Sequence, residues 1–436
     1  MNKRVKILQI VVVILIAFFG GYFFGVNKVA LDWHNYKPIL NVVNKEPPSG
    51  LINIDFNPFW TVWQKLEEGY YDKSKLNQQA MLNGAITGMV QALGDPFTMY
   101  LPPVQNTDFK QNLAGQFSGI GAELSMKGSD IIVIAPLDGS PAEKAGMKAG
   151  DTIVKVNGQS TAGWDLGKTV TLIRGPKGTD VNLTILHKDS QKTVDLKITR
   201  DVITVKSVAM YISNAKCTGS GCSLVVKGDP CTDSTCVKYA YLRLSQFGDN
   251  TNKDWESMVR GISDQISKDR SIKGIVFDLR NNPGGYLTDA QFIASEFLPA
   301  GTKVVSEDPC PQSDCVLTAQ REKGQEGLFT DSKAVKVVIL INGGSASASE
   351  IVSGALRDNK RVVALVGEKS FGKGTVQEAE DLGDGAGLHV TIAKWLTPNG
   401  TWVHGKGLTP DVVVTLDPKD PARDTQLEKA VYELIK

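Results

Sequence analysis

Two short segments carry side chains that could act together as a nucleophile and a base. One is SASASE, residues 345–350, and the other is FGKGTVQ, residues 371–377. Each begins where an apolar run ends, so a serine and Lys373 are expected at the carboxyl ends of two buried strands, where open α/β sheets usually hold their chemistry. A hydroxyl beside an amine indicates nucleophilic catalysis, with the amine as the base.

The serine segment follows a glycine-rich loop, residues 342–345, and runs into a predicted helix over residues 347–359. The first turn of a helix presents free N–H groups and the positive end of the helix dipole to a developing negative charge. Ala348, together with Gly285 in the neighbouring glycine loop, could therefore supply an oxyanion hole. Two simpler interpretations stay open here, because serine often only caps a helix and glycines often only form turns.

A lysine that serves as a general base must be neutral, so the pKa of Lys373 would have to fall from about 10.4 by roughly three pH units through burial. An apolar strand and flanking glycines suit a desolvated amine, and a surface lysine is the alternative. Gln377 could orient the amine with its side-chain carbonyl.

The segment around Lys373 also matches the start of a phosphate-binding loop. However, Gly374 replaces the magnesium-binding Ser or Thr, and no helix is expected after it, so nucleotide binding is not predicted.

The elements that must position both segments form a layered α/β core. Residues 273–280 and 335–341 are continuous apolar runs, as expected of strands buried on both faces. Residues 252–267 and 289–298 have the apolar spacing of helices. The predicted fold class is therefore α/β (α+β) and multidomain.

A glycine-rich module with strand-like patterning precedes the core, over about residues 115–203. Within it, residues 140–146 begin with a capping serine and a proline, which predicts a short helix. The order of these elements, followed by GDTI and VNG, resembles a PDZ domain of the bacterial kind. In such domains the loop before the second strand binds a peptide carboxylate, which here indicates Gly119, Ile120 and Gly121, with the peptide added as a strand beside GAELSM.

The amino-terminal segment is expected to span a membrane. Residues 7–26 hold no charge and are long enough to cross a bilayer core of about 30 Å. Lys3, Arg4 and Lys6 precede them, which by the positive-inside bias leaves the amino terminus in the cytoplasm and the rest of the chain outside. A cleaved signal peptide is the alternative, but the run is long and no small-x-small cleavage site follows it.

The six cysteines form three pairs with one spacing, and each pair brackets turn residues between strand-like segments. The pairs are Cys217 with Cys222, Cys231 with Cys236, and Cys310 with Cys315. We predict disulfides across hairpin tips, each worth about 2 kcal/mol on the chain-entropy model. A zinc site is the alternative, but the spacing and an oxidising compartment outside the cytoplasm argue against it.

Composition bounds the number of domains and the kinds of partner. The chain has 436 residues, of which 42% are apolar and 22% charged, enough for two or three globular domains, and its net charge of +1 gives no footprint for nucleic acid. The predicted divisions are a cytoplasmic amino terminus with membrane anchor (1–30), a linker (31–57), a helical region (58–112), the PDZ domain (113–203), the core (204–417) and a C-terminal helix (418–436).

Four motifs together resemble the C-terminal processing peptidases, also called tail-specific proteases. They are SASASE, FGKGTVQ, DLRNNPGG upstream and HGKGLTPDV downstream, and the resemblance covers about residues 60–417. It implies a serine peptidase with a Ser-Lys dyad, an embedded PDZ domain and often a membrane anchor. By the family's pattern Ser347 is the nucleophile and Lys373 the base.

The resemblance also implies roles for residues around the dyad. Gln377 matches the position that supports the lysine, and the Gly284–Gly285 loop with Ala348 matches the oxyanion donors. Asp358, eleven residues past Ser347, matches an acidic position whose role stays open. No metal or organic cofactor is implied.

One segment departs from the family's pattern, and the histidines have no role in it. Residues 216–237, which carry two of the cysteine pairs, look like an insertion near the core. The four histidines are scattered along the chain, and no Ser-His-Asp arrangement is predicted from them: His34, His187, His389 and His404.

The sequence thus predicts a single-pass protein of the cytoplasmic membrane, whose extracytoplasmic part is a serine endopeptidase that recognises C-terminal tails. Its expected partners are proteins or peptides with accessible apolar C-termini and the membrane, with a homo-oligomer allowed for and nucleic acid excluded. An inactive PDZ adaptor is the alternative from another functional class. An α/β hydrolase for small esters is disfavoured, because the Gly-x-Ser-x-Gly elbow and a placed histidine are missing.

Overall fold

The computed structural model describes residues 54–436 apart from short gaps, and only parts of residues 1–53. The gaps are residues 138, 189, 205, 220, 227–228, 230, 311–314, 321–326, 332–334, 418–419 and 421–422. Before residue 54, the described residues are Val12, Ile14, Leu15, Phe18, Phe19 and the backbone of residues 29–34 and 37–42. The chain divides into two compact units, residues 1–81 and 82–436.

The first unit contains a hairpin and a helix. Its elements are β1 (Val29–His34), β2 (Lys37–Val42), α2 (Asn57–Gly69) and the 3-10 turn η2 (Lys73–Lys75). β1 and β2 pair antiparallel, so the first part of residues 31–57, which were predicted as a linker, lies in a hairpin. Val29, Leu31 and Trp33 alternate with other residues, as in a strand, and this local pattern prevails over the polar composition of the longer segment.

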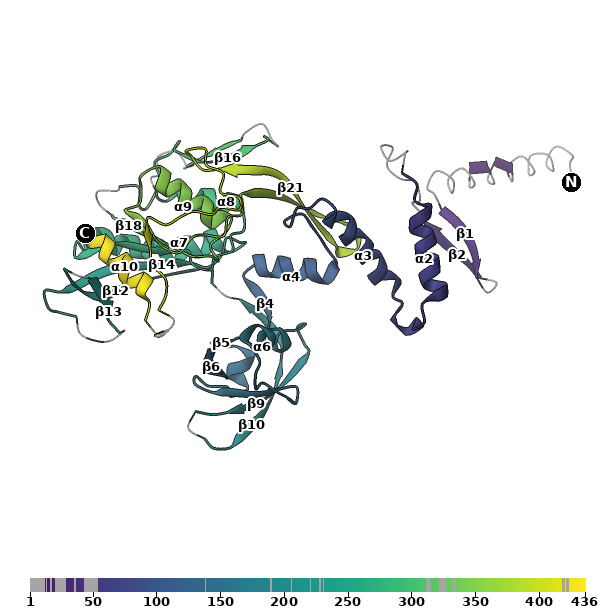
Figure 1. Cartoon of the computed structure of the whole chain (residues 1–436), viewed down its shortest axis with the longest axis horizontal. Helices are drawn as coiled ribbons and strands as arrows, with labels where there is room; N and C mark the ends of the chain where they lie inside the picture. Colours follow the sequence, from purple (N-terminus) through teal and green to yellow (C-terminus); the bar gives the residue numbers. More distant parts are fainter. Residues whose placement is uncertain are drawn as a thin grey trace, which may run out of the picture. The chain divides into compact units, whose positions relative to one another are not determined.

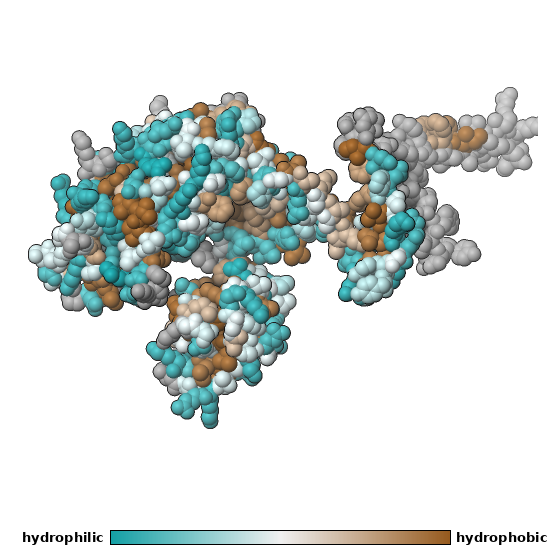
Figure 2. All heavy atoms as spheres, viewed as in Figure 1, coloured by the Kyte–Doolittle hydropathy of each residue, from teal (hydrophilic) through white to brown (hydrophobic). Residues whose placement is uncertain are grey.

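Hydrophobic side chains are prominent on the surface of the first unit. No residue of α2 is buried, and Trp60, Val62 and Leu66 are exposed, which Figure 2 shows as brown surface on the N-terminal helices. Among the described residues no helix is both long and apolar enough to span a membrane. The predicted anchor, residues 7–26, lies mostly outside the described residues.

The second unit starts with helices and then the PDZ module. The connecting elements are α3 (Gln78–Gln91), which begins before the boundary, β3 (Met99–Leu101), α4 (Pro103–Leu113), β4 (Gln116–Gly119) and β11 (Asp201–Thr204). The module's sheet has the order β10-β9-β7-β6-β5, with β8 (Gln159–Ser160) beside β7. These strands are β5 (Ala122–Lys127), β6 (Asp130–Pro136), β7 (Thr152–Val156), β9 (Asp180–Leu186) and β10 (Thr193–Thr199).

Two short helices complete the PDZ module, α5 (Pro141–Lys144) and α6 (Leu166–Ile173). The helix predicted for residues 140–146 is confirmed as α5, and Ser140 caps it by accepting a hydrogen bond from the Glu143 N–H. β5 lies at the edge of the sheet, and α6 lies against it. An edge strand beside a helix leaves backbone groups available to an added peptide strand.

The core is built on a seven-stranded sheet with the order β13-β12-β14-β15-β18-β19-β22. The strands are β12 (Val208–Thr218), β13 (Gly221–Leu224), β14 (Cys236–Leu244), β15 (Ile272–Asp278), β18 (Val337–Ile341), β19 (Ala364–Gly367) and β22 (Val412–Val413). From β14 to β22 all pairs are parallel. The two buried strands predicted from apolar runs are therefore confirmed as β15 and β18.

Helices cover both faces of this sheet, as Figure 1 shows. They are α7 (Thr251–Lys268), α8 (Leu287–Ser295), α9 (Ala348–Asp358) and α10 (Thr425–Ile435). α7, α8 and α9 pack in one hydrophobic cluster with Phe277 and Ile339, and α10 packs in the other with Val276 and Val338. Side chains of one strand thus alternate between two cores. The helices predicted for residues 252–267, 289–298 and 347–359 are confirmed with shifts of one to three residues at their ends, whereas α10 begins seven residues after the start of the segment predicted as a C-terminal helix, residues 418–436.

A second sheet holds the lysine segment. Its order is β17-β16-β21-β20, with β3 also paired to β21. The 3-10 turn η3 (Gly383–Gly385) connects β20 to β21. The strands are β16 (Lys303–Asp308), β17 (Val316–Thr318), β20 (Thr375–Asp381) and β21 (Gly387–Leu396). Lys373 lies just before β20. The segment after it is therefore a strand, whereas a phosphate-binding loop would be followed by a helix.

α10 is tied to the end of β15 through a buried arginine. Arg280 donates from Nη2 to Asp278 at 2.6 Å and to Asp424 at 2.8 Å, and from Nη1 to Gln426 at 3.0 Å. Asp424 also caps α10. Because Arg280 precedes the glycine loop by only a few residues, the C-terminal helix supports the edge of the sheet where the site lies.

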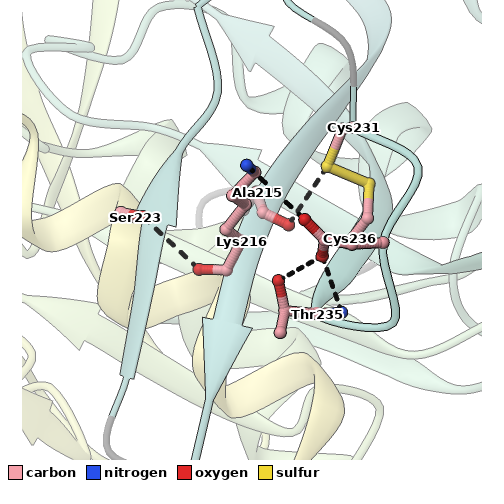
Figure 3. Close-up of a disulfide and its surroundings, with 7 residues drawn as sticks. Ala215, Lys216, Ser223, Cys231, Thr235 and Cys236 are labelled. Carbon is pink, nitrogen blue, oxygen red and sulfur yellow. Dashed lines mark hydrogen bonds and ion pairs between the residues drawn. A yellow bond between two sulfur atoms is a disulfide. The ribbon is translucent and has the colours of Figure 1, made fainter.

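All three predicted disulfides form, and two of them lie at hairpin tips. Cys217 and Cys222 are directly paired across β12 and β13, and Cys310 and Cys315 lie between β16 and β17. Cys231–Cys236 differs from the prediction, because it closes the loop before β14 instead of bridging two paired strands. Figure 3 shows it against β12, with Cys231 Sγ 3.9 Å from the Ala215 carbonyl oxygen.

Candidate active site

Ser347 occupies a strained turn between a strand and a helix. β18 ends at Ile341, and α9 begins at Ala348. Ser347 has φ 53° and ψ −116°, a backbone conformation that residues other than glycine rarely adopt. Such a conformation persists only where its surroundings over-determine the backbone, and it is concentrated at functional sites.

The three serines of the segment have different environments. Ser345 and Ser349 are fully buried, and their hydroxyls donate to carbonyl oxygens of the neighbouring loop, at Leu279 (2.8 Å) and Asn282 (2.9 Å). Ser347 is only partly buried and lines a cavity. Of the three hydroxyl groups, that of Ser347 is the one placed to react.

Glu350 connects the serine turn to the lysine loop. Its buried carboxylate accepts hydrogen bonds from the backbone N–H groups of Ser347 (2.9 Å), Gly372 (2.7 Å) and Lys373 (2.9 Å). It also accepts one from Ser370 Oγ at 2.6 Å. The sequence analysis missed this residue, although a serine followed three positions later by a glutamate is the signature of a capping box and could have pointed to it.

The glycine loop after β15 packs directly on the serine turn. The carbonyl of Asn282 accepts a hydrogen bond from the Ala346 N–H at 3.0 Å, and its side chain accepts one from the Gly284 N–H at 2.9 Å. Gly284 has φ 97°, and a Cβ there would lie 2.8 Å from the Ser347 Cβ. Only glycine allows the two loops this close approach.

The predicted oxyanion donors lie side by side on the cavity wall. Gly285 forms a bridge with Phe247, whose carbonyl oxygen would be 1.6 Å from a Cβ at position 285. Within the part of the chain that the structure describes, neither the Gly285 N–H nor the Ala348 N–H donates a hydrogen bond to a protein group. Both residues line the cavity, so both N–H groups are available to a substrate oxygen.

Lys373 is held by its backbone and is partly buried. Glu350 binds its N–H, and the Trp395 indole donates to its carbonyl at 2.9 Å. Its Nζ lies 5.2 Å from the centre of the Phe97 ring. Burial lowers the pKa of Lys373, and the negative charge of Asp95 acts in the opposite direction. The direction is the one that a neutral general base requires.

Gln377 lies on β20 with its amide facing two hydroxyls. Its Nε2 donates to Thr375 Oγ1 at 2.8 Å and to Thr391 Oγ1 at 3.2 Å. It lines the same cavity as Lys373. The carbonyl oxygen is the amide's remaining hydrogen-bonding group.

One cavity of about 570 Å³ brings together all five residues predicted for catalysis and oxyanion binding. They are Gly285, Ser347, Ala348, Lys373 and Gln377. Among the described residues no hydrogen bond joins Ser347 Oγ to Lys373 Nζ. Much of the remaining wall is apolar, including Met99, Leu287 and Ile351.

A histidine also reaches this cavity, although the sequence analysis found no role for it. His389 lies on β21, is buried, and packs edge-on against Phe109. Burial, followed by the charge of Lys373, lowers its pKa. Its place depends on the register of β21 against β20, which no local motif reveals.

The other residues singled out in the sequence lie away from the cavity wall. Asp358, at the end of α9, accepts a hydrogen bond from the Asn399 N–H at 3.0 Å, so it holds the turn after β21. His187 pairs with Asp151 in the PDZ module at 2.8 Å. His404 stacks on Trp402, and for His34 only the backbone is described.

The predicted carboxylate loop of the PDZ module lies directly before the edge strand β5. Ile120 is buried in the module's core, and its carbonyl accepts a hydrogen bond from the Ala142 N–H at 2.8 Å. Gly121 has φ 73°, and a Cβ there would lie 2.5 Å from the Ser140 Cβ. Gly119 ends β4. The loop is thus a tight glycine turn at the start of the strand that a peptide would extend.

Comparison with known sequences agrees with this geometry. The sequence profile of peptidase family S41 matches residues 238–414, and that of a PDZ domain matches residues 132–186. The carboxy-terminal-processing protease of Bartonella bacilliformis is 39% identical over 338 residues, which cover 78% of this chain and 70% of that protein. The chain belongs to peptidase family S41.

Further matches place it within the carboxy-terminal processing proteases of that family. The protease CtpA of Bacillus subtilis is 34% identical over 362 residues, 83% of this chain and 69% of that protein. A solved structure of a Bacteroides fragilis protein described as an S41 protease covers 85% of this chain and 96% of its own, with a TM-score of 0.53 and 16% identity, and so shares the fold. The predicted resemblance is confirmed: this S41 chain is a serine peptidase with a PDZ domain.

Proposed function

We propose that this S41 peptidase recognises protein C-terminal tails through its PDZ domain and cleaves them with a dyad of Ser347 and Lys373. We also propose that it is anchored in the cytoplasmic membrane, with its catalytic part outside the cytoplasm. The observation that carries the proposal is the strained turn at Ser347, which opens onto the cavity that Lys373 and Gln377 also line. A strained backbone at a reactive hydroxyl is typical of a nucleophile.

In the proposed mechanism, neutral Lys373 takes the proton of the Ser347 hydroxyl while Oγ forms a bond to the carbonyl carbon of the substrate. The carbonyl oxygen becomes an oxyanion and accepts hydrogen bonds from the Gly285 and Ala348 N–H groups. Lys373 then gives its proton to the leaving nitrogen as the C–N bond breaks, which leaves an acyl-enzyme. A water molecule, deprotonated by the same lysine, attacks the acyl carbon; the bond between that carbon and Ser347 Oγ then breaks, Lys373 returns the proton to Oγ, and the new carboxyl terminus is released.

Substrate capture is assigned to the PDZ module. A C-terminal peptide would add as a strand to β5, the edge strand, with its carboxylate at Gly119, Ile120 and Gly121. Apolar side chains in the wall of the cavity would favour apolar residues at the site of cleavage.

Three features support an extracytoplasmic, anchored enzyme. The described residues of the predicted anchor have helical backbone and exposed apolar side chains, namely Val12, Ile14, Leu15, Phe18 and Phe19. Lys3, Arg4 and Lys6 precede it, as expected for a cytoplasmic amino terminus. The three disulfides fit an oxidising compartment. Protease accessibility of the region after residue 54 in intact spheroplasts tests this topology; protection there would contradict it.

The central experiment compares four forms of the full-length protein in detergent: wild type, Ser347→Ala, Lys373→Ala and Lys369→Ala. Lys369 is an exposed lysine of the same loop and serves as the matched control. With proteins that end in apolar tails, wild type and Lys369→Ala should cleave equally, and the dyad variants should lose at least about 1,000-fold. Equal cleavage by all four would refute the dyad. Absence of cleavage by wild type would favour an inactive PDZ adaptor.

A further inference from the structure

A loop far upstream of the S41 profile reaches the catalytic lysine. Residues 92–98 connect α3 to β3, and the Phe97 ring lies 5.2 Å from Lys373 Nζ. Asp95 shapes this loop, because its Oδ1 accepts a hydrogen bond from the Phe97 N–H at 3.0 Å and its Oδ2 one from Thr98 Oγ1 at 2.7 Å. The turn chemistry alone would explain an aspartate here. Its further contacts point to a second role.

Asp95 is linked to Gln377 through Thr391. The Thr391 side chain interacts with the Asp95 carboxylate and lowers the pKa of that carboxyl, and the Thr391 N–H donates at 3.0 Å to Thr98 Oγ1, the same hydroxyl that donates to Asp95. Thr391 lies on β21 directly opposite Gln377 on β20, and Gln377 Nε2 donates to its Oγ1 at 3.2 Å. The chain of contacts therefore runs from Asp95 across the hairpin to the amide beside the lysine.

The direction of these hydrogen bonds is fixed by the groups that take part. An ionised carboxylate only accepts, and a threonine hydroxyl has one proton, so Thr391 must donate to Asp95 and can only accept from Gln377. Gln377 must then turn its NH₂ group to Thr391, and its other N–H goes to Thr375 at 2.8 Å. The carbonyl oxygen of Gln377 is then the remaining acceptor of its amide, in a residue that lines the same cavity as Lys373.

The argument requires Asp95 to be charged. Burial acts to raise the pKa of Asp95, but hydrogen bonds from Thr391, Thr98 and the backbone hold it below its usual value. The charge of Asp95 raises the pKa of Lys373 against the larger effect of burial. The other titratable groups around the lysine are Glu350, which binds its N–H, His389 on β21, and His404, which contacts Phe97.

We propose that Asp95 is a positioning residue of the Ser-Lys site: acting through Thr391, it orients the Gln377 amide so that its carbonyl oxygen meets the Lys373 amine. An amine that donates one N–H to a fixed carbonyl has its lone pair directed away from it, which fixes the line along which it can take a proton. The proposal rests on the roles of Ser347, Lys373 and Gln377 given under the proposed function.

The kinetic test is a double-mutant cycle on the full-length enzyme, with Asp95→Asn, Thr391→Val and the two combined. Asp108→Asn, an exposed carboxylate on α4, is the matched control. Each single variant should lower kcat about tenfold, a part of the 10²–10⁴-fold that a positioned base contributes, and the double variant should lose no more than either. Asp108→Asn should match wild type. If the effects of the two variants multiply, Asp95 does not act through Thr391 and the proposal is overturned.

A second measurement is independent of peptidase activity. Acetylation of Lys373 by acetic anhydride, followed by mass spectrometry at a series of pH values, reports the pKa of the amine. Thr391→Val leaves every charge in place but frees Gln377, so the midpoint should move to lower pH by about 0.5 unit, because Lys373 in its charged form loses an acceptor. An unchanged midpoint would overturn the proposal. If the midpoint shifts but the wild-type protein cleaves no tail, the positioning role of Asp95 stands and the proposed function is refuted.

Discussion

The two halves of the site are assembled in different ways. The serine turn is held by residues of its own segment and by the loop after β15, the strand next to β18 in the sheet. The surroundings of Lys373 come from segments far apart in the chain, namely residues 95–98, 377 and 389–391. The proposed nucleophile, Ser347, therefore belongs to a short rigid motif, whereas the surroundings of the proposed base, Lys373, depend on how β3, β20 and β21 pair.

Glu350 is where the two halves meet, and the largest effect is expected from its removal. In Glu350→Ala, the N–H groups of Ser347, Gly372 and Lys373 lose their acceptor inside the protein. We expect kcat to fall about 1,000-fold, because both reactive groups shift, and stability to fall by about 3 kcal/mol. Peptide cleavage and urea unfolding measure the two effects. Glu350→Gln, which keeps one acceptor oxygen, should be intermediate, and a destabilised Glu350→Ala enzyme with normal kcat would show that the halves are not coupled.

Gly285→Ala tests the serine half alone. A Cβ there would lie 1.6 Å from the Phe247 carbonyl oxygen, so the bridge must break and the N–H must turn out of the cavity. The loss of one oxyanion donor predicts a fall in kcat of about 100-fold or more. Gly343→Ala is the matched control, because its Cβ would meet no atom closer than 4.0 Å. Similar kinetics of the two variants would argue against Gly285 as a donor.

Phe97→Leu tests the lysine half with a smaller change. The ring near Lys373 Nζ favours the charged amine, so its loss should lower the pKa of Lys373 and move the acid limb of the pH profile down by about 0.5 unit. kcat at high pH should stay within about threefold of wild type. Phe117→Leu removes a ring that lies 4.9 Å from the Arg174 guanidinium and serves as the control. A shift to higher pH would contradict the assigned contact.

Asp289→Asn should change stability and leave kcat nearly unaltered. Burial raises the pKa of Asp289 to about 6, and among the described residues its Oδ2 has no hydrogen-bond partner. The folded state thus binds a proton more tightly than the unfolded chain does, and wild-type stability falls as pH rises from about 4 to about 6. The asparagine removes this loss, so it should add about 1–2 kcal/mol at pH 7.5 and little at pH 4. Urea unfolding at both values measures it, and an equal gain at both would refute the pKa as the cause.

The difference between the halves explains what the sequence could predict. SASASE, the glycine loop and the helix after Ser347 are local patterns, and they pointed to Gly285, Ser347, Ala348 and Lys373, which the structure brings to one cavity. Asp95, Phe97 and His389 reach the lysine only because β3 and β20 pair with β21. No spacing in the sequence encodes that register.

The features that the structure places differently from the prediction also depend on contacts between distant segments. Two cysteine pairs lie at hairpin tips, where turn residues predict them, but Cys231–Cys236 sits in a loop whose path depends on β12. The hairpin of β1 and β2 was not predicted, because composition averaged over residues 31–57 concealed a short alternating stretch. Local chemistry was thus predictable, and contacts between distant segments were not.

The contact between Arg280 and Asp424 has a consequence for the timing of synthesis. The ribosome makes Ser347 and Lys373 before it makes α10, the helix that covers the second face of β15 and β18. Until Asp424 docks on Arg280, the sheet edge that carries the glycine loop is unfinished. A chain that has been made only as far as Lys373 therefore lacks the contact that completes the edge of the sheet beside the glycine loop.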